Sequence, residues 1–202
     1  MISVSEPRKN TNQSTVLSNG ALGMILFIAS EIMFFSGLIS AYVVSASDNA
    51  TAWPPKWQPR LPVEATAFNT LLLIASAVTL FIAIRKIKKD GDTKKGSTFL
   101  KWTILLGTAF VTFQGYEWVR LIGNGLTTSS SLFGAFFYTI IGAHGIHAFA
   151  GVIYLVVVSL KIIKTIELDL KIKMITTLSI FWYFVVLLWP ILYLLVYVLP
   201  AR

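Results

Sequence analysis

Apolar residues along this chain fall into five long runs, separated by short polar segments. The runs cover residues 21–45, 65–84, 101–122, 132–160 and 174–199. A helix needs about 20 apolar residues to cross the hydrocarbon core of a bilayer, which is about 30 Å thick. Each run reaches that length, so the pattern predicts an all-α integral membrane bundle of five transmembrane helices.

One uncharged stretch is too long to be a single helix. No Asp, Glu, Lys or Arg occurs between Arg120 and Lys161, and an unbroken helix over that distance would be about 60 Å long. Gly123-Asn124-Gly125 and the cluster Ser129-Ser130-Ser131 are turn-forming sequences. We therefore expect a turn there and a fourth helix beginning at residue 132.

The ends of the chain differ in character. Residues 1–19 are polar and lack apolar periodicity, so we expect a short disordered tail, whereas residues 20–202 form one transmembrane domain. The first apolar run is too long for the core of a signal peptide and has no small-residue cleavage site after it. We expect it to remain in the membrane.

Composition and charge support this interpretation and add an orientation. Hydrophobic residues make up 55% of the chain and charged residues 13%, and the mean hydropathy is +0.73. The net charge of +8 would suggest nucleic acid in a soluble protein, but here we expect no nucleic-acid partner. With the N-terminus inside, thirteen Lys and Arg lie on one side of the membrane and four on the other. Positive loops stay in the cytoplasm, so we predict a cytoplasmic N-terminus and a periplasmic C-terminus.

Glu31 lies near the middle of the first predicted helix, where an ionised carboxylate costs a few kcal/mol or more. Two interpretations stay open. The carboxyl group either relays protons, or it is a protonated, buried group that forms a hydrogen bond to a neighbouring helix.

Three polar residues follow one face of the third predicted helix. Glu117 and Arg120 are three residues apart, so they can pair, with Arg120 reaching the lipid headgroups. Gln114 lies one turn earlier and offers an amide to another helix. We expect all three to make lipid or helix contacts.

His144 and His147 are the only histidines of the chain, and they lie at mid-depth of the fourth predicted helix. Two histidines three residues apart on one helix cannot bind both sides of a haem iron. A copper or zinc site would need further ligands, and the chain has no Cys. We expect contacts with lipid or a neighbouring helix, and neither a metal nor a cofactor bound by this chain.

Four blocks of sequence resemble one family. Residues 26–37, which surround Glu31, are similar to the membrane-glutamate signature of cytochrome c oxidase subunit III and its quinol oxidase counterparts. The further blocks, in the order of the family, are Phe68-Asn69-Thr70, Thr112 to Trp118 and Phe137 to His147. The last helix departs from the family pattern, because Tyr183 and Val186 stand where the family has His and Asp.

The resemblance implies a five-helix bacterial subunit III that is not itself catalytic. It implies that haems and copper belong to partner subunits, that this chain sits against subunit I in a complex with subunit II and other respiratory subunits, and that it binds phospholipid. It also implies a role in keeping the proton uptake region of subunit I intact, and a multi-pass location in the bacterial inner membrane. Glu31 matches the family glutamate known for its reactivity with carbodiimide.

Two alternatives remain at this point. An accessory subunit of nitric oxide reductase has the same five-helix form. A small proton-conducting transporter centred on Glu31 and the histidines is the other, although the chain has no internal repeat and only one uncompensated carboxylate at mid-membrane depth. The sequence does not indicate whether the electron donor is cytochrome c or a quinol.

Overall fold

A computed structural model describes residues 18–48, 52–89 and 91–201 of the chain. It contains five long α-helices and a short helical extension at the C-terminus. The helices are α1 (Asn19–Asp48), α2 (Val63–Lys88), α3 (Thr93–Gly123), α4 (Leu132–Lys164) and α5 (Leu168–Tyr193), followed by the π-helix η1 (Leu194–Val198) and the 3₁₀ turn η2 (Leu199–Ala201). Most of the predicted disordered tail, residues 1–17, lies outside the described residues.

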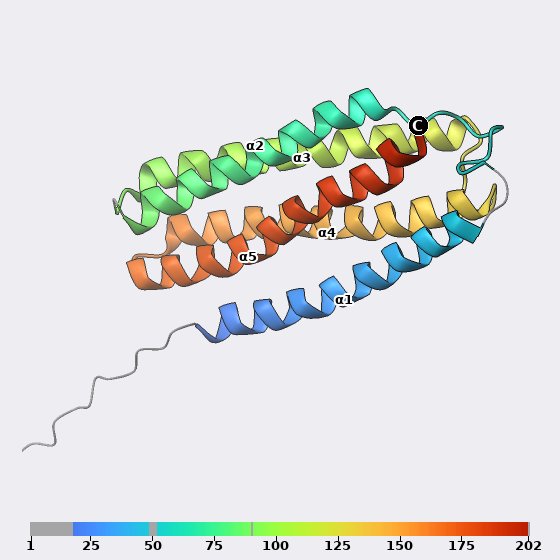
Figure 1. Cartoon of the computed structure of the whole chain (residues 1–202). Helices are drawn as coiled ribbons and strands as arrows, with labels where there is room; N and C mark the ends of the chain where they lie inside the picture. Colours follow the sequence, from blue (N-terminus) through green and yellow to red (C-terminus); the bar gives the residue numbers. More distant parts are fainter. Residues whose placement is uncertain (1–17, 49–51, 90, 202) are drawn as a thin grey trace, which may run out of the picture.

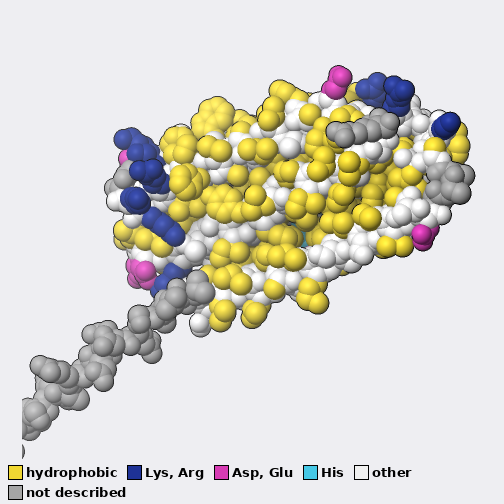
Figure 2. All heavy atoms as spheres, viewed as in Figure 1, with side chains coloured by type: hydrophobic (Ala, Val, Ile, Leu, Met, Phe, Trp, Pro, Cys, Tyr) yellow, Lys and Arg dark blue, Asp and Glu magenta, His cyan; other side chains and the backbone are white. Residues whose placement is uncertain are grey.

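The five helices run side by side and alternate in direction, so that the connections gather at two ends of a bundle (Figure 1). One end of the bundle, which we call the lysine end, carries the α2–α3 and α4–α5 connections. The opposite end, which we call the proline end, carries the α1–α2 and α3–α4 connections. In the face shown in Figure 2, hydrophobic side chains cover the middle of the bundle, and Lys and Arg gather at its ends. This is the surface that a bilayer-spanning bundle requires.

Four of the five helices, α1, α2, α4 and α5, are long and apolar enough to cross a membrane by length and composition. Helix α3 is not among them, and it contains the polar residues Thr103, Gln114 and Glu117 within its apolar run. These three side chains are buried in contacts with neighbouring helices. A fifth membrane span at α3 therefore stays a prediction.

The helices extend beyond the apolar runs at the lysine end. Helix α3 begins at residue 93 rather than at the predicted 101, because Asp92 caps it: the Lys95 N–H donates to Asp92 Oδ1 at 2.9 Å. The backbone N–H of Lys95 also holds the pKa of the Asp92 carboxyl below its usual value, with further help from the positive charge of Lys95. The helices therefore continue into the polar segments that flank the apolar runs, and the apolar pattern alone predicts helices that are too short.

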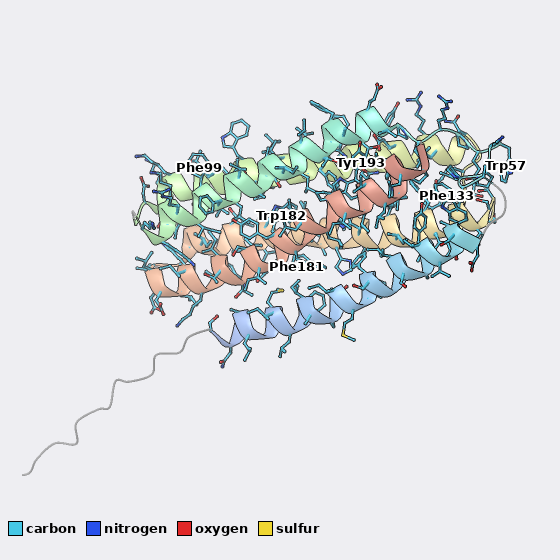
Figure 3. All side chains as sticks on the ribbon, in the orientation of Figure 1. Trp57, Phe99, Phe133, Phe181, Trp182 and Tyr193 are labelled. Atoms are coloured by element: carbon cyan, nitrogen blue, oxygen red, sulfur yellow. The ribbon has the colours of Figure 1, made fainter. Side chains whose placement is uncertain are left out.

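Trp182 is the centre of the helix packing. Its ring is fully buried between Gly107 of α3 and Gly151 of α4, and its indole N–H donates to Ser76 Oγ of α2 at 3.1 Å. In Figure 3 the ring points from α5 into the bundle, whereas Phe181 points toward α1. Two glycines thus admit one large side chain that joins four helices.

Helix α1 is the least embedded of the five. Only Ala21, Phe35 and Tyr42 of its residues are buried, and its main neighbours are α5 and, to a smaller extent, α4. Figure 1 shows it lying along one side of the bundle. Helix α1 is therefore attached mainly through α5, with a smaller contact to α4.

The predicted break between the third and fourth helices is confirmed. Helix α3 ends at Gly123, Gly125 adopts a φ of +92°, and the Ser131 hydroxyl caps α4 by accepting from the Gly134 N–H at 2.9 Å. The Gln58 amide donates to Ser130 Oγ at 3.2 Å and also to the Ser131 hydroxyl. This links the two connections of the proline end.

Candidate site of buried polar contacts between the helices

Glu31 and His147 meet across the contact between α1 and α4. Oε2 of Glu31 lies 3.0 Å from Nε2 of His147, and the two side chains are 17% and 18% exposed. Both residues sit near the middle of their helices. The structure therefore places the carboxyl group of Glu31, near the middle of α1, against a neighbouring helix and next to His147.

The other ring nitrogen of His147 decides where a proton must lie. Nδ1 is 2.7 Å from the carbonyl oxygen of Ala143, one turn earlier in α4, and a carbonyl can only accept, so Nδ1 carries a hydrogen. A neutral imidazole then has a bare Nε2. Nε2 is therefore the ring nitrogen that contacts Glu31 Oε2 at 3.0 Å, and this is a contact of distance, since Oε2 has no partner with full hydrogen-bond geometry among the described residues.

Aromatic rings close this pair off from the core. Phe35, which is buried, packs edge-on against the His147 ring with the ring centres 5.5 Å apart, and Phe181 lies 6.5 Å from it. The apolar surroundings strengthen the electrostatic contact between Glu31 and His147 and make an unpaired charge there costly.

Glu117 makes contacts other than those expected from its spacing along α3. Its side chain is buried, and its Oε2 accepts from the Thr66 hydroxyl of α2 at 2.9 Å and from the Gln114 amide at 3.4 Å. The expected ion pair with Arg120 is not formed among the described residues, where Arg120 is exposed. Rotation of α3 turns Glu117 toward α2, which the sequence spacing does not reveal.

A network of polar side chains continues from Glu117 toward the core. Gln114 accepts from the Asn69 amide at 3.4 Å and donates to the Tyr197 hydroxyl at 3.0 Å, and Asn69 also donates to the carbonyl of Phe110 at 3.1 Å. The Trp189 indole donates to the Thr70 hydroxyl at 2.9 Å. The network joins α2, α3, α5 and η1 in the half of the bundle nearer the proline end.

Sequence reasoning missed the partners Thr66, Tyr197 and Trp189. The signal for Thr66 is its position on the buried stripe of α2, which also contains Asn69, Thr70, Leu73 and Ser76 at helical spacing. No comparable signal marks Tyr197 or Trp189 as partners, because their hydrogen bonds cross between helices far apart in the sequence.

His144 is fully enclosed and does not join His147. Its ring stacks on Trp189 with centres 5.0 Å apart and touches the edge of Phe110. Neither ring nitrogen has a hydrogen-bond partner among the described residues, so His144 contacts the neighbouring helices through its ring faces and edges. His144 lies at the base of an apolar groove of about 280 Å³ between α3 and α4.

A haem does not fit these histidines. Both nitrogens of His147 are engaged by Ala143 and Glu31, and the ring of His144 is covered by Trp189 and Phe110. Among the described residues, no group of three or more His, Cys, Asp or Glu side chains could hold a metal ion. Among the described residues, the side chains of Glu31, His147 and Glu117 contact neighbouring helices instead.

A second hollow opens at the proline end, between α2 and α3, with a volume of about 420 Å³. Arg60 and Arg120 lie at this hollow together with Asn124, and Glu117 lines it one turn deeper. Phe68, Phe113 and Tyr116 line its apolar part. Arg120 is thus brought to a hollow at the end of the bundle and forms no ion pair with a carboxylate among the described residues.

Comparison with known proteins gives one consistent result. The family model described as cytochrome c oxidase subunit III matches residues 4–200. The chain is 31% identical over 179 residues to a cytochrome c oxidase subunit 3 of Corynebacterium diphtheriae, covering 88% of this chain and 86% of that protein. It is 30% identical over 177 residues to a probable cytochrome c oxidase subunit 3 of Nocardia farcinica, with the same coverage. It is also 32% identical over 188 residues to a cytochrome c oxidase subunit 3 of Pelomedusa subrufa, covering 91% of this chain and 70% of that protein.

Proposed function

Because the chain belongs to the cytochrome c oxidase subunit III family, we propose that it is the non-catalytic subunit III of a bacterial haem-copper terminal oxidase. In this role it binds subunit I, stabilises the proton uptake region of that subunit, and holds phospholipid. The haems and copper belong to the partner subunits. The observation that carries the proposal is the family match over nearly the whole chain.

The contacts of Glu31 support a structural role rather than a catalytic one. Its carboxyl group is engaged by His147 at 3.0 Å, and the pair joins the least embedded helix, α1, to α4. We therefore favour the interpretation of Glu31 as a helix contact over that of a proton relay.

The orientation is part of the proposal. The lysine end faces the cytoplasm and the proline end faces the periplasm, because eleven described Lys and Arg lie at the lysine end and three at the proline end. Lys94 is exposed in the first turn of α3, and the chain has no Cys. In intact cells, Lys94→Cys should resist a membrane-impermeant thiol reagent and react only after lysis. Full labelling before lysis would show that the lysine end faces the periplasm and would contradict the proposed orientation.

Removal of the chain tests the proposed role. A strain that lacks this chain but retains the other oxidase subunits should start oxygen consumption at a near-normal rate and then lose activity during continued turnover. Re-expression of the chain should restore the steady rate. An unchanged rate through prolonged turnover would contradict the stabilising role, and a complete loss of initial activity, with the other subunits still assembled, would contradict its non-catalytic nature.

A further inference from the structure

Two arginines from different helices and connections meet at one hollow of the proline end. Arg60 lies three residues before the start of α2, and Arg120 lies three residues before the end of α3, so both are at the level where the helices leave the bilayer. Both side chains are exposed and both line the hollow between α2 and α3. Among the described residues, neither guanidinium has an ion-pair partner.

The lining below the arginines is apolar and faces outward. Tyr116 lies four residues before Arg120 along α3, and Phe113 lies three residues before Tyr116. At this spacing the three side chains lie on one face of the helix. Phe68 of α2 completes the same hollow, and all three aromatic side chains are exposed. A positively charged rim above an outward-facing aromatic surface matches a phospholipid, whose phosphate lies at the headgroup level and whose acyl chains run down the helices.

The single carboxyl group of the hollow does not remove this match. Glu117 lies one turn deeper than Arg120, and its Oε2 is engaged by the Thr66 hydroxyl and the Gln114 amide inside the helix contact. A phosphate held at the level of the arginines stays above it. Two guanidinium groups without partners favour a headgroup with net negative charge over a zwitterionic one, because a quaternary ammonium group would be repelled at the rim.

We propose that the hollow formed by Arg60, Arg120, Phe68, Phe113 and Tyr116 binds an anionic phospholipid, with its phosphate between the two guanidinium groups. This site rests on the lipid binding proposed above. The lipid lies between α2 and α3 at the proline end, and its headgroup is anionic. The test of this proposal uses the full chain without the other oxidase subunits, so it can fail while the proposed function holds.

The test is photo-crosslinking in nanodiscs of phosphatidylcholine that contain a trace of phosphatidylglycerol with a diazirine in one acyl chain. The crosslinks of the full chain are mapped to peptides and competed with unlabelled lipid. We expect saturable crosslinks on the peptides that contain Phe68, Phe113 and Tyr116, displaced by phosphatidylglycerol and not by added phosphatidylcholine. Inorganic phosphate at millimolar concentration should not displace them, because it has no acyl chain to occupy the aromatic surface.

The variant Arg60→Gln/Arg120→Gln should weaken binding at this site by roughly twenty-five-fold, on the basis of about fivefold for each arginine near the membrane surface. The matched control, Arg85→Gln/Lys89→Gln, removes two exposed charges at the lysine end and should leave the site unchanged. Equal displacement by phosphatidylcholine, displacement by inorganic phosphate alone, or unchanged crosslinking in the arginine variant would each overturn the proposal.

Discussion

Nε2 of His147 lies 3.0 Å from Oε2 of Glu31, across the contact between α4 and α1. The same imidazole has its Nδ1 2.7 Å from the carbonyl of Ala143, so its ring is held on both sides. Among the described residues, the Tyr42 hydroxyl also links α1 to the bundle by donating to the carbonyl of Leu195, at 3.4 Å. The contact between Glu31 and His147 is the shorter of these two links.

Replacement of Glu31 separates the two interpretations of this carboxyl group. In Glu31→Gln, the amide can donate to the bare Nε2 of His147, so we expect normal assembly and normal turnover. In Glu31→Ala, the imidazole loses its partner in an apolar place, at a cost of roughly 1 to 3 kcal/mol, and the subunit should be lost from the complex more readily. The measurements are turnover of the oxidase and retention of this chain after purification.

A proton relay gives the opposite pattern. It requires a titratable group, so Glu31→Gln and Glu31→Ala would slow proton uptake to a similar degree while the chain stays bound. That outcome would rule out the structural interpretation.

The two histidines should respond oppositely to the same substitution. His144→Phe keeps the ring stacked on Trp189 and removes two buried nitrogens without partners, so the melting temperature of the purified chain should stay the same or rise. His147→Phe leaves Glu31 without its partner, and a cost of about 1 to 3 kcal/mol should lower the melting temperature by several degrees. A larger loss of stability in His144→Phe than in His147→Phe would contradict the contacts described for both residues.

Single added methyl groups test the slot that holds Trp182. In Gly107→Ala the new Cβ would lie 2.8 Å from Cη2 of Trp182, and the ring cannot move aside because Gly151 and Ser76 fix its other side. We expect a loss of about 1 to 3 kcal/mol in the free energy of unfolding. Gly115→Ala, on the same helix, meets no atom within 4 Å and should be neutral. Thermal denaturation of both variants in the same detergent compares them, and equal melting temperatures would refute the tight fit.

The sequence predicts the number of helices well, because apolar runs of bilayer length leave few other structures. The turn at Gly125 and Ser131 was also predictable, since both residues have a local role that depends on their own conformation or side chain. The contacts between helices were not predictable from the sequence. Spacing along α3 predicts that Glu117 pairs with Arg120. The rotation of α3 against α2 instead brings Glu117 to Thr66, whose hydroxyl donates to its carboxyl group.

Helix rotation also explains the two histidines. Three residues along a helix separate side chains by about 60° around its axis. That angle is enough to turn His147 toward α1 while His144 faces Trp189 of α5. Which of the two histidines contacts Glu31 depends on the packing of three helices. The local sequence pattern therefore does not predict it.

The cap at Asp92 gives a prediction about pH. The pKa of this carboxyl is lower in the folded chain than in the unfolded one, mainly because the Lys95 N–H donates to it. The stabilising contribution is therefore present above the unfolded pKa and is lost as the pH falls through the folded pKa. Hydrogen-exchange protection of the first turn of α3, corrected for the intrinsic exchange rate, should fall on acidification.

Asp92→Asn is the control for this prediction. An Asn side chain still accepts from the Lys95 N–H but does not titrate, so the acid-dependent loss of protection should disappear while protection near neutral pH persists. The same acid-dependent loss in both proteins would show that another group is responsible.

Purification of the tagged chain from its native membranes in a mild detergent tests the central claim most directly. The account predicts that the chain brings with it a haem-containing partner in stoichiometric amount, that the complex consumes oxygen, and that the chain separated from the complex has no Soret band. Purification without any haem protein, or with a complex that reduces nitric oxide and not oxygen, would contradict the proposal that this chain is subunit III of a terminal oxidase.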